Sequence, residues 1–277
     1  MAATLTSRIL APVLDLPRSA RLAAWGTGVL SATVPLASAV EAVVRDDEPH
    51  AVRWEGEGLP GVAAAPQDLT TLLAGLSACG AGRLLLTLPV PGDPRGLPGP
   101  PAVNVAALEA GECVVAEVDG HGPRWALVPE VSEFGSVWEP GAFVTWAAHP
   151  AAPRRAPEAS SVAESERELR VALQTATRAL AALDVARWRE EAADRIAAVR
   201  DGGLVRDAVP PGTSARALRV LQTAARVLAI VDLATEDDGA AITSLEAGSR
   251  AAALREVGAV ARRALVAAVN AHTEPVP

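Results

Sequence analysis

The sequence predicts an α+β N-terminal domain followed by an all-α domain, and three observations support this fold class. Residues 1–150 combine helix-like segments with later strand-like segments, whereas residues 159–277 show only helical spacing of apolar residues. Residues 151–158 are rich in proline, alanine and arginine, as linkers often are. A segment of the second region is also written twice. We therefore expect an acidic α+β domain at 1–150, a linker at 151–158 and a helical domain at 159–277.

The repeated segment organises the C-terminal region. Residues 173–186 (LQTATRALAALDVA) and 221–234 (LQTAARVLAIVDLA) are identical at nine of fourteen positions, at a constant offset of 48. A fixed offset over so long a match indicates a duplicated helical unit. Each copy places apolar residues at steps of four and three, which makes one seam along a helix. Small seam residues and short loops predict a roughly four-helix antiparallel bundle. The predicted seams are Leu169, Leu173, Ala176, Leu180 and Leu183; Ala217, Leu221, Ala224, Leu228 and Val231; and Leu254, Val257, Ala261, Ala264 and Ala268.

The first 150 residues mix helices with strands. Helical spacing or proline breaks mark some segments, and alternation or short apolar runs mark others. Helices that precede antiparallel strands favour an α+β domain over a doubly wound sheet. The expected helices are 19–30, 35–44 and 67–78, and the expected strands are 51–55, 83–90 (central in the sheet), 113–118, 124–128 and 142–147, with a rigid surface loop at 91–101.

The start of the chain has a second interpretation. Residues 22–40 carry no charge and end near Ala37-Ser38-Ala39, which imitates an export signal with its cleavage site. Polar residues and the breaks at Gly26, Gly28 and Pro35 weaken that resemblance and make the run too polar for a membrane span. We expect two short helices here, with an export signal as the alternative.

Missing residue types exclude several kinds of site. All 25 basic residues are arginine, so a phosphate loop of the Gly-Lys-Ser/Thr kind, a Schiff-base lysine and a kinase-type lysine are excluded. Two cysteines cannot form a disulfide framework or a four-cysteine zinc site. We expect no cofactor, no metal and a cytoplasmic location. The arginine, alanine and proline excess is typical of a GC-rich bacterial genome.

Charge is divided unevenly between the two regions. Residues 1–150 hold 8 arginines and 16 acidic residues, whereas residues 151–277 hold 17 of each. An acidic region repels nucleic acid, whose binding depends on neutralising phosphates. We therefore expect no nucleic-acid partner, and a helical region whose mixed charges lie on solvated faces.

The best candidate for a binding site is the segment Glu130–Pro140 (EVSEFGSVWEP), which we expect to be a loop between two strands. It places Phe134 and Trp138 beside Glu133 and Glu139, and loops with aromatic and acidic side chains often line binding clefts. His121 and His149 are candidates for a base near this loop. The alternative is a loop that packs its aromatic residues on the core, as we expect for Trp54, Trp125, Trp146 and Trp188.

Two further groups of polar residues are better explained by structure than by function. Asp184 and Asp232 are equivalent in the repeat, as are Arg178 and Arg226. Duplicated carboxylates can bind a cation, but the histidines of bundle metal sites are missing, so helix-surface residues are the simpler interpretation. Asp46, Asp47, Glu48 and His50 are adjacent potential metal ligands, and we expect a solvated turn instead.

Two functions remain open at this point. The first is a non-catalytic interaction or assembly protein whose bundle mediates contacts with a protein partner or with a second copy, because no catalytic set is visible and a two-helix repeat offers an apolar seam. The second is an enzyme or small-ligand binder with a cleft in the N-terminal domain near Phe134 and Trp138. A deep pocket where these residues meet a titratable group would favour the second.

Overall fold

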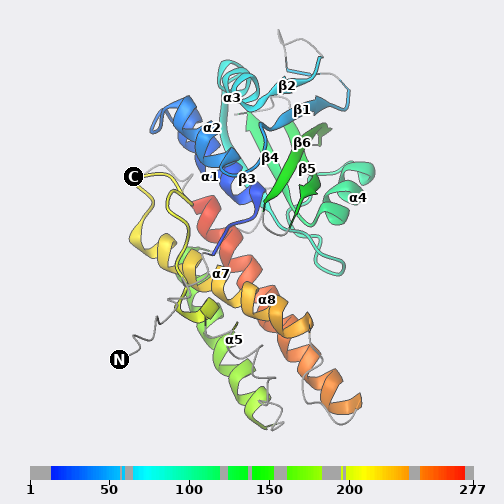
Figure 1. Ribbon diagram of the computed structural model, residues 1–277, viewed down its shortest axis with the longest axis vertical. Coiled ribbons are helices and arrows are strands. Elements are labelled where there is room, and N and C mark those ends of the chain that lie inside the picture. The colour runs from blue at the N-terminus through cyan, green and yellow to red at the C-terminus, as the bar shows by residue number, and fades with distance from the viewer. Residues whose placement is uncertain are drawn as a thin grey trace, which may run out of the picture. The chain divides into compact units, whose positions relative to one another are not determined.

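The computed structural model describes residues 14–56, 58–59, 65–118, 124–136, 139–152, 161–182, 195, 198–236 and 244–271. The chain divides into two compact units that interleave in sequence. The sheet unit comprises Leu16–Glu166, Asp207–Leu221 and Arg263–Pro277, and the helix unit comprises Met1–Asp15, Arg167–Arg206 and Gln222–Arg262. The predicted mixed α+β composition is confirmed, since the described strands all lie before residue 152 and the described elements after it are helices (Figure 1). The predicted linker remains a prediction, since residues 153–160 lie outside the described ranges.

The sheet unit is built on a six-stranded mixed sheet in the order β2-β1-β6-β5-β4-β3. Strand β1 runs parallel to β6, and the other neighbouring strands are antiparallel. The elements in chain order are α1 (Arg18–Leu30), α2 (Leu36–Val44), β1 (Ala51–Trp54), β2 (Gln67–Asp68), α3 (Leu69–Ala78), β3 (Ala81–Thr87), α4 (Pro101–Ala110), β4 (Cys113–Val118), β5 (Arg124–Gly135) and β6 (Pro140–Ala151).

Helices cover both faces of this sheet (Figure 1). On one face, Val103 and Ala107 of α4 pack with Leu85 of β3 and with neighbouring apolar residues of β4 and β5. On the other face, α1 approaches β3 so closely that a side chain at Gly26 would collide with Leu84. Because successive strand residues point to opposite faces, Leu84 and Leu85 belong to two separate core layers.

The prediction that the strand near residues 83–90 lies in the centre of the sheet is wrong. Strand β3 forms one edge of the sheet, paired only with β4 among the described strands. Its continuous apolar run (Leu84, Leu85, Leu86) arises because helices bury both of its faces, and coverage of both faces gives an edge strand the same sequence pattern as a central one.

Helix α4 was not predicted, and it begins at the last residue of the predicted loop 91–101. Pro101 occupies the first turn, where backbone N–H groups have no acceptor within the helix, so the missing N–H of proline costs no hydrogen bond. Gly111 ends the helix in the left-handed conformation, with a φ of 72°. A proline-rich sequence therefore concealed a helix start that proline itself favours.

The run at residues 22–40 covers most of α1 and the first half of α2, so the prediction of two short helices is confirmed. Its side chains Leu22 and Ala23 are fully buried in the sheet unit. Of the helices that the structure describes, none is both long and apolar enough to serve as a membrane span.

The helix unit is formed by parts of three long helices, α5 (Val162–Ala182), α7 (Ala215–Glu236) and α8 (Ser244–Asn270). All five apolar residues predicted on one side of α8 are buried, although Ala264 and Ala268 lie in the part of α8 that belongs to the sheet unit. A Cβ atom at Gly258 would lie 3.4 Å from Val231 Cγ1, so α8 and α7 approach closely there. The two copies of the repeat differ in burial, because Leu221 is 1% exposed whereas its equivalent Leu173 is half-buried.

Candidate functional site

The predicted binding loop at 130–140 is wrong in its secondary structure. Residues Glu130–Gly135 continue strand β5, and β6 begins at Pro140. The two strands stay paired from Arg124↔Ala151 to Gly135↔Pro140 and form a long hairpin. The segment lacks the usual alternation of a half-buried strand because most of its side chains are exposed on both faces.

The outer end of this hairpin carries both phenylalanines of the chain, Phe134 and Phe143. Their rings stack with centroids 4.5 Å apart, yet the residues are 43% and 55% exposed. Gly141, which pairs with Phe134 across the hairpin, provides the space, since a Cβ atom there would lie within 3.0 Å of three ring carbons. The two rings therefore form an apolar surface that the described residues leave open to solvent.

A hollow of about 440 Å³ lies beside the hairpin end. Its lining combines the hairpin with the start of α1 and the turn after α2, namely Arg18, Asp46, Asp47, Glu133, Phe134, Gly135, Ser136, Gly141 and Ala142. The backbone N–H of Glu48 donates to the carbonyl of Ala142 at 2.9 Å, which fixes the turn against β6. The hollow is of ligand size and bears both charges and an aromatic ring.

The wall of the hollow contains a charged network centred on Asp47. Arg18 donates to both carboxylate oxygens, at 2.8 and 2.7 Å, and Arg21 Nη2 lies 3.5 Å from Oδ2. His50 Nε2 lies 3.2 Å from the same oxygen. Burial opposes ionisation of Asp47, but the hydrogen bonds from Arg18 and His50 outweigh it and lower its pKa. The predicted solvated turn at residues 46–50 is therefore wrong for Asp47 and His50, which point inward.

The hydrogen bonds of His50 define its protonation state. Trp146 Nε1 lies 3.2 Å from His50 Nδ1, and an indole nitrogen can only donate. Nδ1 must therefore accept, so Nε2 carries the proton and donates to Asp47. Burial lowers the pKa of His50, and the Asp47 carboxylate offsets this only in part. With no solvent exposure of its side chain and both nitrogens engaged, His50 is a structural residue rather than a base for a ligand in the hollow.

A second half-buried carboxylate, Glu112 between α4 and β4, supports the start of α1. Glu112 Oε2 accepts a 2.8 Å hydrogen bond from the backbone N–H of Ser19, in the first turn of α1. That N–H has no intrahelical acceptor, so the carboxylate replaces a cap. Burial raises the pKa of Glu112 despite this bond. The helix that carries Arg18 into the hollow is thus anchored at its N-terminus.

Comparisons with known proteins identify the family. A family model described as the N-terminal domain of Rv1486c-like proteins matches residues 19–160, and the model for their C-terminal domain matches residues 163–266. The chain belongs to the Rv1486c-like family. Two curated relatives from Mycobacterium tuberculosis, "Uncharacterized protein Rv1486c" of strain H37Rv and "Uncharacterized protein MT1533" of strain CDC 1551, are each 34% identical over 210 residues, covering 69% of this chain and 70% of their own. No solved structure matches the chain.

In this Rv1486c-like chain the predicted site residues are only partly brought together. Glu133, Phe134 and Glu139 lie at the hairpin end, and all three are exposed. His149 lies on the same hairpin but pairs with Ala126, so it is eight residues, or roughly 27 Å of strand, from Gly141 opposite Phe134. Trp138 and His121 lie outside the described residues.

The duplicated polar residues have unlike surroundings. Arg226 is half-buried and donates from Nη2 to the carbonyl of Gly202 at 2.8 Å, whereas Arg178 is exposed. Asp232 is exposed, and Asp184 lies outside the described residues. Among the residues that can be placed, no three His, Cys, Asp or Glu side chains are grouped as metal ligands would be.

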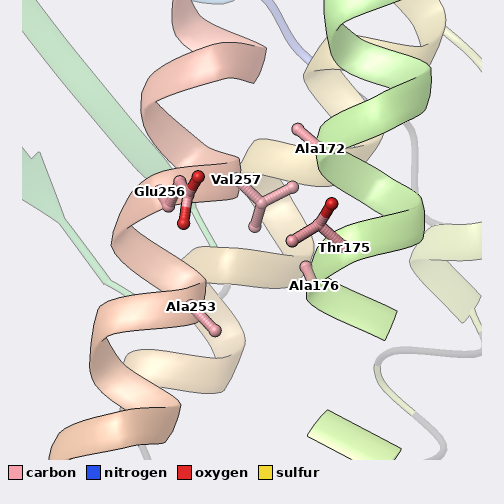
Figure 2. A pocket seen from close by; sticks show the side chains of 6 residues that line it. All are labelled: Ala172, Thr175, Ala176, Ala253, Glu256 and Val257. Atoms are coloured by element: carbon pink, nitrogen blue, oxygen red, sulfur yellow. The ribbon is translucent and has the colours of Figure 1, made fainter. Parts of the chain in front are cut away.

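A second cavity, between α5 and α8, is too small for a metabolite. Figure 2 shows Val257 of α8 pointing toward α5, where Thr175 and Ala176 lie. The space measures about 30 Å³, which water fills but a larger ligand does not. It is a packing gap between helices with small side chains.

Sequence reasoning identified Phe134 and Glu133 but missed Phe143, Arg18 and the contact between His50 and Trp146. Phe143 was hidden because its partner Phe134 was assigned to a loop. His50 and Trp146 are separated by 96 residues, and no local pattern connects them. The expectation that Trp54, Trp125 and Trp146 are core residues is confirmed, since they are 9%, 3% and 0% exposed.

Proposed function

We propose that this protein is a non-catalytic interaction protein that binds a protein partner through the outer end of the β5–β6 hairpin. The observation that carries this proposal is the exposure of the stacked pair Phe134 and Phe143. Burying a phenylalanine side chain typically stabilises a protein by about 1.5–3 kcal/mol. A chain with only two such residues that leaves both about half exposed gives up part of that stabilisation in isolation, and a partner restores it.

Cross-linking at the hairpin end tests this function. A photo-reactive phenylalanine analogue at position 143 should yield one dominant adduct in cells of the producing organism, and the double variant Phe134→Ser, Phe143→Ser should lose the corresponding complex. Val105→Ser is the matched control, because Val105 is 54% exposed but lies on α4. Equal complex formation by all three proteins, or the absence of any adduct at position 143, would contradict the proposal.

The proposal keeps the finer architecture expected from the sequence. We propose that the C-terminal region is a roughly four-helix antiparallel bundle with an internal helical duplication. The bundle mediates protein–protein or domain contacts. The buried seam on α8 and the close approach of Gly258 to Val231 support this. A cytoplasmic location is part of the proposal and is supported by the small number of cysteines. The protein binds neither nucleic acid nor membrane in this proposal, which its acidic balance supports.

A small-ligand binder is the second candidate, because the hollow beside Phe134 has the volume of a metabolite site. Its carboxylates Asp46 and Glu133 and its aromatic ring suit an organic cation better than an anion. A thermal-shift screen with polyamines and other metabolite amines tests this candidate. A rise in melting temperature that disappears in Glu133→Gln would support it, and no shift across the panel would exclude it.

A further inference from the structure

The hairpin β5–β6 projects beyond the strands on either side of it. Strand β4 pairs with β5 only as far as Leu127, and β1 pairs with β6 only from Thr145. Residues 128–135 and 140–144 therefore form a two-stranded ribbon, paired with each other but with no further strand beside them among the described residues. This ribbon carries Phe134 and Phe143.

The hydrogen bonds at the end of the ribbon show which peptide groups of β5 point away from β6. Ser136 and Glu139 exchange two backbone hydrogen bonds of 3.2 Å, so they form a bonded pair. Bonded and non-bonded pairs alternate along an antiparallel ladder. The residues of β5 that turn their peptide groups away from β6 are therefore Pro129, Val131, Glu133 and Gly135.

Strand β6 confirms this assignment independently. The same alternation turns the peptide groups of Ala142 and Ala148 away from β5, and their carbonyls do accept hydrogen bonds from Glu48 and Glu55. On β5 the equivalent outward groups of Val131 and Glu133 have no hydrogen-bond partner within the described part of the chain. Pro129 stands at the start of this stretch and limits it, since it has no N–H to offer.

The other long edge of the sheet is closed by side chains. On β3, Thr27 Oγ1 accepts from the N–H of Leu84 at 3.0 Å and donates to its carbonyl at 3.2 Å. Two residues further, Asn270 accepts from the N–H of Leu86 at 2.8 Å and donates to its carbonyl at 3.0 Å. Both side chains bond as a neighbouring strand would, which protects β3 against strand addition. The fold therefore closes the outer edge of β3 but leaves the projecting edge of β5 open among the described residues.

The charges around the open edge indicate the chemistry of its partner. Glu133 and Glu139 are exposed on the hairpin, and Glu48 is exposed on the adjoining turn. The nearby arginines are already paired, Arg53 with Glu130 at 2.8 Å and Arg45 with Asp46 at 3.3 Å. The surplus is negative, and a second copy of this chain, with a net charge of −8, would bring like charges to it.

We propose that the edge of β5 from Pro129 to Gly135 binds an extended, basic segment of a partner protein as an added strand. This inference rests on the interaction role proposed above. Main-chain hydrogen bonds to Val131 and Glu133 hold the segment, as in other cases of strand addition. Its basic side chains face Glu133 and Glu139, and an apolar side chain covers Phe134 and Phe143.

The test uses two synthetic ten-residue peptides, one alternating valine with arginine and one alternating valine with glutamate. The basic peptide should bind the full-length protein in fluorescence anisotropy, more weakly as salt increases, and the acidic peptide should not bind. Val131→Pro removes one outward N–H and should weaken binding about tenfold or more. The matched control, Val131→Ala, keeps that N–H and should bind like the parent protein.

Three results would overturn the proposal: equal binding by Val131→Pro and Val131→Ala, binding of the acidic peptide, or a Val131-dependent self-association in sedimentation. If Val131→Pro fails to fold by circular dichroism, a basic peptide methylated at alternate backbone nitrogens replaces it, and undiminished binding of that peptide contradicts strand addition. Loss of the cellular complex in Phe134→Ser, Phe143→Ser but not in Val131→Pro would leave the interaction role intact and reject the added strand alone.

Discussion

At the scale of single residues, the structural role of Asp47 and His50 depends on their hydrogen-bond partners and not on residue type alone. The acidic turn after α2 has the composition of a metal-binding or solvated loop, yet Asp47 is held by Arg18 and His50 by Trp146. Each bond satisfies a group that burial would otherwise penalise. The result is a rigid wall beside the hollow and no free histidine nitrogen in it.

Trp146→Phe should destabilise the protein more than Trp54→Phe. Both rings are buried, but Trp146 Nε1 donates to His50 whereas Trp54 Nε1 has no hydrogen-bond partner in the described structure. Removing the Trp146 donor leaves Nδ1 of His50 without a hydrogen-bond partner. This should lower the free energy of unfolding by about 1–3 kcal/mol more than the loss of ring volume, which both variants share. Urea unfolding at pH 7.5 measures the difference. Equal losses in the two variants would show that the Trp146 bond contributes nothing.

His50 should also make stability depend on pH. Burial lowers its pKa below the ordinary 6.5, so the unfolded chain takes up a proton at a higher pH than the folded protein does. The contribution of neutral His50 to the free energy of unfolding is complete above about pH 6.5 and declines as the pH falls below that value. The free energy of unfolding should therefore drop between pH 7.5 and 5.5, and drop less in His50→Gln. Comparing the two proteins cancels the opposite trend of Glu112, whose raised pKa lowers stability as pH rises.

At the scale of secondary-structure elements, the outer edge of β3 and the projecting edge of β5 differ in how their backbone groups are paired. One side chain of α1 and one of α8 form hydrogen bonds with the backbone of β3. Strand β5, in contrast, extends past β4 with no strand paired to its outer edge among the described residues. Hydrogen bonds from side chains close an edge without adding a strand, so the sheet stops at β3. Edge position is thus decided by residues distant in sequence, Thr27 and Asn270.

Asn270→Ala should open the edge of β3. Leu86 is fully buried, and the variant removes the partners of both its peptide groups, which should lower the free energy of unfolding by about 1–3 kcal/mol. Self-association through the bare edge should increase in sedimentation. Asn104→Ala is the control, because its described side-chain hydrogen bond is accepted from the N–H of Gly99 in a loop and not from a strand. If both variants behave alike, Asn270 does not protect the edge.

At the scale of the whole molecule, the compact units do not follow the order of the chain. Residues Asp207–Leu221 and Arg263–Pro277 belong to the same unit as the sheet, although the model for the N-terminal family domain ends at residue 160. Asp207 accepts a hydrogen bond from Trp25 Nε1 at 3.1 Å, and Asn270 completes β3. The sheet unit therefore needs chain segments from the far half of the sequence.

A fragment containing residues 1–160 should be less stable than the full chain and more prone to self-associate. It lacks the partners of Trp25 and of Leu86, three hydrogen bonds in all, each involving a buried residue. The loss should amount to several kcal/mol, since each unsatisfied group costs about 1–3 kcal/mol. Thermal unfolding and light scattering measure both effects. Co-production with residues 161–277 should restore the melting temperature, and a fragment as stable as the full chain would refute this view of the unit.

Local pattern in the sequence determined the class of each region, the two opening helices, the buried tryptophans and the apolar seam of α8. Periodicity carries that information because burial of one face imposes it on neighbouring residues. Tertiary structure alone decided that β3 is an edge, that Glu130–Gly135 is strand rather than loop, that His50 faces Trp146, and that Phe134 stacks on Phe143. Each of these depends on residues brought together across the fold, and spacing along the chain does not record such contacts.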